Sequence, residues 1–271
     1  MEQPKVRKPA VAGQFYPGTA QALRKEIESL VLKQDKSFDV IACMLPHAGY
    51  MYSGKVAAQT VSAVNIKEKV VLFGPNHTGY GTPYSIMAEG VWQTPLGVVK
   101  IDSVLAKKIL TGSKYFEADE QAHLYEHSLE VELPFLQYFK SNFEMVPIAF
   151  LSDDFQALQA VGKEVAATLL DILDKAMIVA SSDMTHYESQ SEASRKDHEA
   201  IKAILELDEV KLFERVKSLR ISMCGYAPVI AMISAAKALG AKNAKLIKYQ
   251  TSGDVTGDME SVVGYAGVII Y

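Results

Sequence analysis

The amino-acid sequence predicts an α/β protein in which a mixed or parallel central sheet is flanked by helices. Short, continuous apolar runs rich in β-branched residues are typical of strands that helices cover on both faces. Stretches with helical periodicity lie between these runs, and alternating strands and helices define an α/β layer fold. No repeat, linker or low-complexity tract divides the sequence, so we expect one domain over residues 1–271.

The first expected elements lie in residues 20–110. A helix is expected at 20–33, where apolar residues recur at helical intervals between charged ones, namely at Leu23, Ile27, Leu30 and Val31. Strands are expected at VIACML from Val40 and at VVLFG from Val70, with a helix at 53–64 between them. Residues 85–101 fit a hairpin whose short extended pieces are broken at Gly90, Pro95 and Gly97, and a helix at 103–110 follows.

The second half of the chain continues the alternation. Helices are expected at 126–139, 155–173, 191–205 and 226–239, and the run MIVAS from Met177 is a strand between the second and third of them. Two further strands, AKLIKYQ and VVGYAGVIIY, close the sequence. The chain is therefore expected to end inside the sheet.

Composition excludes several classes of protein. The sequence has 28 Lys and Arg against 32 Asp and Glu, a formal charge of -4, and this gives no excess of cations with which to bind nucleic acid. No stretch reaches the roughly 18 apolar residues of a membrane span, and the first residues mix charges with prolines where a secretory signal needs an apolar core. We expect a cytoplasmic protein with no membrane or nucleic-acid partner, and its two cysteines form no disulfide framework.

Histidines follow each of the three strongest expected strands. His47 lies in LPHAGYMYSG, His77 in GPNHTGYG, and Asp183 and His186 in SSDMTHY. Ligands of open α/β sheets bind beyond the carboxyl ends of the strands, where such loops converge. A lone histidine is more often a hydrogen-bonded turn residue, but three at equivalent strand ends favour a shared pocket. Imidazole is the commonest protein metal ligand, so the pattern indicates a metal-binding or catalytic pocket.

Cys224, in SMCGYAP, is a further candidate metal ligand and would supply a thiolate beside the imidazoles. We expect it at the start of a helix, where the positive end of the helix dipole lowers the pKa of a thiol and favours thiolate. A thiolate there could ligate metal or attack a substrate. The alternative is an inert buried cysteine, the usual fate of a free thiol and the interpretation we give Cys43.

The segment HLYEHSLEVELPFLQYF carries a further cluster. His123 and His127 lie four residues apart and would share one face of the expected helix. The zincin motif requires Glu directly after its first histidine, and Leu124 stands there, which excludes a protease of that type. One interpretation is a solvated acidic helix start, with Glu126 and Glu130 on the exposed face, and it also suits His123. His127, next to Glu126, is the better candidate for a proton carrier.

Seven motifs together resemble one known family. In order they are AVAGQFYPG, LPHAGYMYSG, GPNHTGYG, EHSLEVELPFLQ, SSDMTHY, CGYAP and SGDVTGD. They are similar to those of the MEMO family, called AmmeMemoRadiSam system protein B in prokaryotes, and the resemblance spans residues 11–271. It implies a fold similar to class III extradiol dioxygenases, which does not by itself transfer their reaction.

The resemblance also implies roles for site residues. It places a metal, copper or iron, on His47, His77 and Cys224, with Asp183 and His186 lining the same pocket. His127 matches the acid–base histidine of the related dioxygenases. Those enzymes complete their iron site with a carboxylate where this chain offers Cys224, which argues against ordinary ring cleavage. The family name further implies pathway partners of the radical-SAM and AMMECR types.

Three functions are compatible with these features. The leading hypothesis is an iron- or copper-dependent oxidoreductase, with zinc also suited to the ligands, in which His127, His186 and Asp183 serve the chemistry of an unidentified small molecule or peptide. The second is a metal-free hydrolase with Cys224 as nucleophile. The third is a non-catalytic module that binds phosphorylated or anionic peptides.

Overall fold

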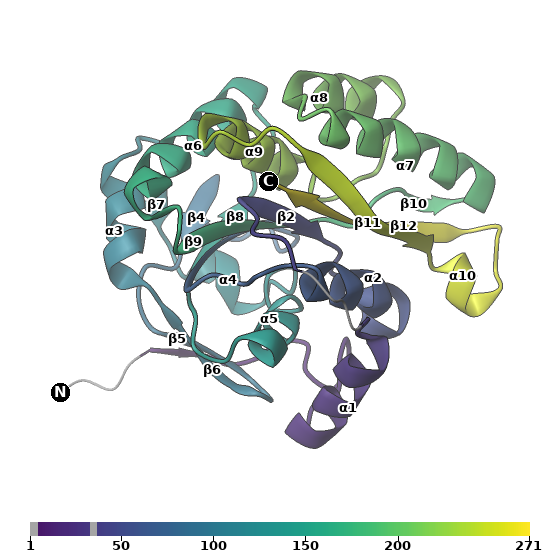
Figure 1. Ribbon diagram of the computed structural model, residues 1–271, viewed down its shortest axis with the longest axis horizontal. Coiled ribbons are helices and arrows are strands. Elements are labelled where there is room, and N and C mark those ends of the chain that lie inside the picture. The colour runs from purple at the N-terminus through teal and green to yellow at the C-terminus, as the bar shows by residue number, and fades with distance from the viewer. Residues whose placement is uncertain (1–4, 33–36) are drawn as a thin grey trace.

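The computed structural model describes residues 5–32 and 37–271, and its centre is one twelve-stranded sheet within that part of the chain (Figure 1). The strands are β1 (Val6–Arg7), β2 (Ala42–Leu45), β3 (Lys69–Pro75), β4 (Tyr84–Ile86), β5 (Val91–Thr94), β6 (Gly97–Ile101), β7 (Glu117–Ala118), β8 (Glu144–Phe150), β9 (Ala176–Ser181), β10 (His186–Glu188), β11 (Ala244–Thr251) and β12 (Val262–Ile270). Their main order is β1-β5-β6-β8-β3-β9-β2-β12-β10; β11 pairs with β12, and β4 with β7 and β8. The sheet is therefore mixed, with a parallel centre.

The helices form a layer on each face of this sheet (Figure 1). They are α1 (Ala20–Leu30), α2 (Tyr50–Ser62), α3 (Ser103–Thr111), α4 (Gln121–Leu124), α5 (Leu133–Phe139), α6 (Phe155–Leu169), α7 (Gln190–Leu205), α8 (Glu209–Ser218), α9 (Tyr226–Ala238) and α10 (Gly253–Thr256), with a 3-10 turn at Leu170–Ile172. In Figure 1, α6 to α9 lie above the sheet, and α1, α2 and α5 lie below it. None of the helices in the described residues is long and apolar enough to cross a membrane.

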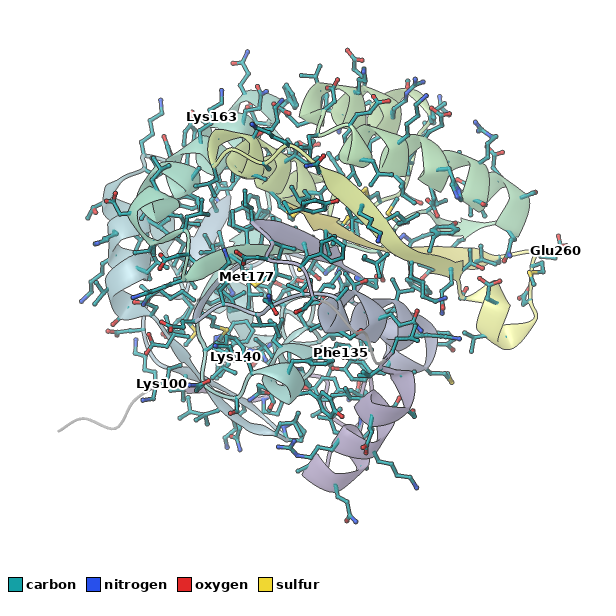
Figure 2. The ribbon with its side chains drawn as sticks, viewed as in Figure 1. Lys100, Phe135, Lys140, Lys163, Met177 and Glu260 are labelled. Atoms are coloured by element: carbon teal, nitrogen blue, oxygen red, sulfur yellow. The ribbon has the colours of Figure 1, made fainter. Side chains whose placement is uncertain are left out.

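Two hydrophobic cores occupy the two faces. Along β3, Val71 and Phe73 pack with α6 and α9, whereas Val70 and Leu72 pack with α1, α2 and α5. This alternation explains the continuous apolar runs, because a strand covered on both faces needs apolar side chains at every position. Figure 2 shows Phe135 and Met177 inside the molecule and Glu260 at its edge.

The predicted α/β fold is confirmed. The three strands expected at the centre are β2, β3 and β9, and they are parallel neighbours, with Ile178 of β9 opposite both Ala42 and Val71. β5 and β6 form the expected hairpin. The last strand, β12, lies between β2 and β11, so the chain ends inside the sheet as predicted.

Some element boundaries differ from the prediction. The first helix ends at Leu30, where Val31 takes an extended conformation, and the expected end at Lys33 lies outside the described residues. β8 was not predicted from the sequence, and it contains Pro147, a residue that cannot donate to a sheet and is unusual in a central strand. It nevertheless pairs in parallel with β3, Pro147 standing opposite Leu72.

The helix expected at 126–139 is wrong over its first half. Only α5, from Leu133, is a sustained helix, and the chain before it runs in turns. Glu126 and Glu130, expected on an exposed face, are 1% and 0% exposed. Buried carboxylates require partners, and Glu130 has the guanidinium of Arg7 and the hydroxyl of Tyr16. These long-range bonds determine the path of the segment.

Candidate metal centre

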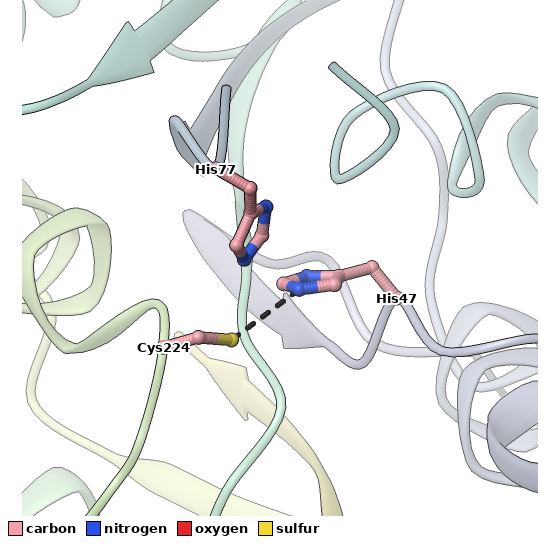
Figure 3. A group of neighbouring side chains, drawn as sticks. All are labelled: His47, His77 and Cys224. Carbon is pink, nitrogen blue, oxygen red and sulfur yellow. Dashed lines mark hydrogen bonds between the residues drawn. The ribbon is translucent and has the colours of Figure 1, made fainter. Parts of the chain in front are cut away.

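The loops after β2, β3 and β9 meet at the carboxyl edge of the sheet, as the sequence predicts. They bring His47, His77 and Asp183 together. The turn before α9 adds Cys224 beside the two histidines (Figure 3). The ligand atoms of His47, His77 and Cys224 all lie within 4.8 Å of one another. Cys224 Sγ is 3.3 Å from His47 Nε2. Two imidazoles and a thiol, distant in sequence, thus converge on one point.

His47 is held from two sides. Its Nδ1 lies 2.7 Å from Ser181 Oγ, and its backbone N–H donates to Asp183 Oδ1 at 2.8 Å. Burial, aided by the nearby imidazoles, lowers the pKa of His47 well below the usual histidine value. The ring is therefore neutral at physiological pH, which is the form that binds metal.

His77 is oriented by Glu126, a site residue that the sequence analysis placed on the protein surface. Glu126 Oε1 accepts a hydrogen bond from His77 Nδ1 at 2.9 Å and others from the backbone N–H groups of His127 and Ser128 at 2.9 and 2.8 Å. Although burial raises its pKa, these bonds and the nearby histidine lower the pKa of Glu126 to about 2. The ionised carboxylate keeps a proton on His77 Nδ1 and leaves Nε2 free, as in carboxylate–histidine–metal sites.

A variant tests this orienting role. Glu126→Gln is expected to weaken binding of Zn²⁺, a redox-inert probe, by about 10–100-fold, because loss of an outer-shell partner typically costs that much. Chelator competition measures the affinity. An unchanged affinity would show that Glu126 does not act on a metal ligand.

The expected low pKa of Cys224 is wrong for the metal-free protein. Burial and then the neighbouring Asp183 raise the pKa of the thiol, and these effects outweigh the helix start that follows at Tyr226. The backbone N–H of Asp183 points at Cys224 Sγ at 3.3 Å. A Cβ on Gly225 would come 2.2 Å from Ser181 O, so only glycine lets Cys224 approach so closely. Cys43 is a separate, buried free cysteine in β2.

The raised pKa predicts how metal affinity changes with pH. A metal that binds Cys224 must displace the thiol proton, so affinity is expected to rise with pH, by about tenfold per unit for one proton released. Cys224→Ser is expected to flatten this dependence. Zn²⁺ titrations at several pH values across the neutral range measure the slope; a flat slope in the unaltered protein would mean that the thiol does not ligate the metal.

A cavity of about 400 Å³ opens beside the cluster. The predicted residues His127, Asp183 and His186 line it together with both histidines of the cluster, and its other walls include Phe15, Tyr52, Tyr187 and Tyr265. The His127 ring stacks on that of His77 with centroids 4.8 Å apart. Burial lowers the pKa of His127 and raises that of Asp183 to about 6. The cavity thus combines aromatic walls with groups suited to proton transfer.

His123 does not join the site. Its ring packs against Trp92 and reaches Ser85 O at 3.1 Å, and burial lowers its pKa to about 4. The shared helical face predicted for His123 and His127 does not exist, because α4 ends at Leu124. His123 is a core residue.

The cluster fits a metal ion. His47 and His77 each have one ring nitrogen engaged by a partner, Ser181 or Glu126, so each can present the other as a ligand. Three protein ligands beside an open cavity are typical of catalytic rather than closed structural sites. A second possible group, His77, Glu126 and His127, fits less well because the Glu126 oxygens already accept several N–H donors.

The fold and site define an α/β protein with a histidine–histidine–cysteine cluster at the carboxyl edge of its parallel strands. The sequence pattern of the family described as Memo-like protein matches residues 7–269, and the chain belongs to that family. The resemblance drawn from the seven motifs is thereby confirmed.

Relatives named MEMO1 family protein match nearly the whole chain. One from Methanococcoides burtonii is 47% identical over 267 residues, covering 98% of this chain and 100% of its own. Another from Aquifex aeolicus is 43% identical, covering 98% and 99%. Among solved structures, the uncharacterised protein JW3007 from Escherichia coli K12 superposes with a TM-score of 0.60 at 15% identity, covering 84% of this chain and 98% of that one, which shows a shared fold alone.

Proposed function

We propose that this protein is a metal-dependent oxidoreductase that holds iron or copper on His47, His77 and Cys224. The observation that carries the proposal is the convergence of three ligand atoms within 4.8 Å of one another, beside an open cavity. Imidazole with thiolate suits Cu(I), Fe(II) and Zn(II), of which the first two support redox chemistry. A bound iron or copper ion would exchange electrons with substrate or dioxygen.

The residues of the cavity supply the remaining functions. His127, kept neutral by burial and stacked on His77, is placed to accept a proton from a substrate hydroxyl. Asp183, with its pKa raised to about 6, can exchange a proton near neutral pH. Ser222 orients His186, whose Nδ1 lies 2.9 Å from Ser222 O. The aromatic walls suit an apolar, phenolic substrate.

The two alternative functions have weaker support. The contact between Cys224 and His47 resembles a cysteine–histidine dyad, but burial raises the pKa of the thiol and opposes a free thiolate nucleophile. A module for phosphorylated or anionic peptides would have to rely on imidazoles and backbone amides, because among the described residues neither Lys nor Arg lines the cavity, whereas the acidic Asp183 does. Radical-SAM and AMMECR-type proteins remain predicted partners.

The test is dioxygen chemistry in protein loaded anaerobically with Fe²⁺ or Cu⁺. We expect the metal to change oxidation state on exposure to dioxygen, followed by electron paramagnetic resonance, and oxygen uptake with a phenolic substrate panel. His127→Gln is expected to keep the metal and slow turnover by about 10²–10⁴-fold, the usual contribution of a positioned acid or base. His198→Gln, an exposed histidine on α7, is the control. Loaded protein that is inert to dioxygen would contradict the proposal.

A further inference from the structure

Glu132 is a buried carboxyl group that the proposed chemistry does not use. It is 0% exposed, and its Oε1 lies 2.8 Å from Ser181 Oγ. Its other oxygen, Oε2, has no hydrogen-bond partner. Glu126 and Glu130 pair with basic side chains, but Glu132 forms no ion pair within the described residues. An unpaired carboxylate in such a place would carry a large desolvation cost.

The hydrogen-bond contacts of Ser181 indicate whether the Glu132 carboxyl group carries a proton. Ser181 Oγ has three neighbours at hydrogen-bonding distance: Ser128 O at 2.8 Å, Glu132 Oε1 at 2.8 Å and His47 Nδ1 at 2.7 Å. A serine hydroxyl has one hydrogen and two lone pairs. The Ser128 carbonyl can only accept, so it takes the single Ser181 hydrogen. The other two neighbours must then donate, which requires a proton on Glu132 and a proton on His47 Nδ1.

We propose that Glu132 is a neutral carboxylic acid that donates a hydrogen bond to Ser181 Oγ, and that it is a positioning residue for His47. In this arrangement Ser181 is fully satisfied and accepts from His47 Nδ1–H. The His47 Nε2 lone pair is therefore left facing Cys224 and the metal position. The claim that Glu132 is protonated does not depend on metal binding. The claim that Glu132 positions a metal ligand rests on the proposed function.

The surroundings of Glu132 favour the neutral form. Burial, and secondarily Asp183, raise its pKa well above the usual carboxyl value. The other titratable groups that sense it, Cys43 and Tyr50, are themselves buried and become negative when they ionise. The unpartnered Oε2 is also less costly as the carbonyl oxygen of an acid than as part of an anion.

Infrared spectroscopy of the metal-free protein tests the protonation. At neutral pH we expect a carbonyl stretching band of a protonated carboxylic acid that disappears in Glu132→Gln. The band is expected to persist in Glu164→Gln, which removes a partly buried carboxyl group on α6. Absence of the band from the unaltered protein at neutral pH, or its persistence in Glu132→Gln, would overturn the proposal.

Zn²⁺ affinity tests the positioning role. The amide of Glu132→Gln keeps a neutral donor for Ser181, so this variant is expected to bind Zn²⁺ about as tightly as the unaltered protein. Glu132→Met removes the donor and is expected to bind about 10–100-fold more weakly. Equal losses in both variants, or no loss in Glu132→Met, would overturn the positioning role. If the unaltered protein binds no Zn²⁺, the proposed function and the positioning role fail, and the infrared result still decides whether Glu132 is neutral.

Discussion

Cys224→Ser is expected to lower the affinity for Zn²⁺ by about 100-fold or more. Loss of an outer-shell partner already costs about 10–100-fold, and Cys224 is one of only three protein groups in the cluster. A serine hydroxyl ionises far less readily than a thiol and is a poor ligand for these metals. Chelator competition at one fixed pH provides the measurement.

Cys43→Ala is the matched control for this thiol. Cys43 is a free cysteine buried in β2, on the sheet face that packs against α1, α2 and α5. Its removal is expected to leave Zn²⁺ affinity unchanged. Equal losses in the two variants would show that thiol removal acts on the fold, and an unaltered affinity in Cys224→Ser would exclude Cys224 as a ligand.

Arg7→Met is expected to destabilise the fold by about 3–5 kcal/mol, because it leaves the Glu130 carboxylate buried without its cation. Arg7 is 2% exposed, lies 4.3 Å from the Trp92 ring centroid and donates from Nε to His123 O at 3.0 Å. It therefore joins the first strand to the segment that precedes α5. Urea unfolding of the metal-free protein measures the change.

An exposed arginine provides the comparison. Arg195 pairs with Glu192 on the surface of α7, and Arg195→Met is expected to change stability little, because exposed ion pairs are screened by water. A similar, small effect in both variants would contradict the importance assigned to the buried pair.

The site histidines could be predicted because the pattern that indicates them, a histidine soon after an apolar strand, is local in the sequence. His47 and His77 each follow an apolar run, and the ends of parallel strands necessarily share one edge of the sheet. The same logic placed Asp183 and His186 at this edge. That these residues share one site could be predicted, but the distances between them could not, because those distances depend on the twist of the sheet.

The acidic residues of EHSLEVE could not be placed from the sequence. Glu126 and Glu130 are four residues apart, a spacing that suits one solvated face of a helix, yet Glu126, Glu130 and Glu132 are all buried. The groups that hold them lie far away in the chain: Arg7 at Glu130, His77 at Glu126 and Ser181 at Glu132. Such burial is decided by long-range contacts that no local pattern contains.

The pKa of Cys224 could not be predicted from the sequence for a similar reason. Its position before a helix was predicted, and a helix start alone favours thiolate. The structure adds burial and the nearby Asp183, which both raise the pKa. A bound metal cation would reverse this balance, which is consistent with a ligand role for the thiol.

X-ray absorption spectroscopy of the metal bound to anaerobically purified, untagged protein tests the central claim most directly. We predict near-stoichiometric iron or copper bound by one sulfur and by the nitrogens of two imidazoles. The metal–sulfur distance is expected to be about 2.3 Å, as in a zinc–thiolate bond. The sulfur is expected to disappear in Cys224→Ser and to remain in Cys43→Ala. A metal shell of nitrogen and oxygen alone, or protein that holds no metal and cannot be reconstituted, would contradict a histidine–histidine–cysteine metal centre.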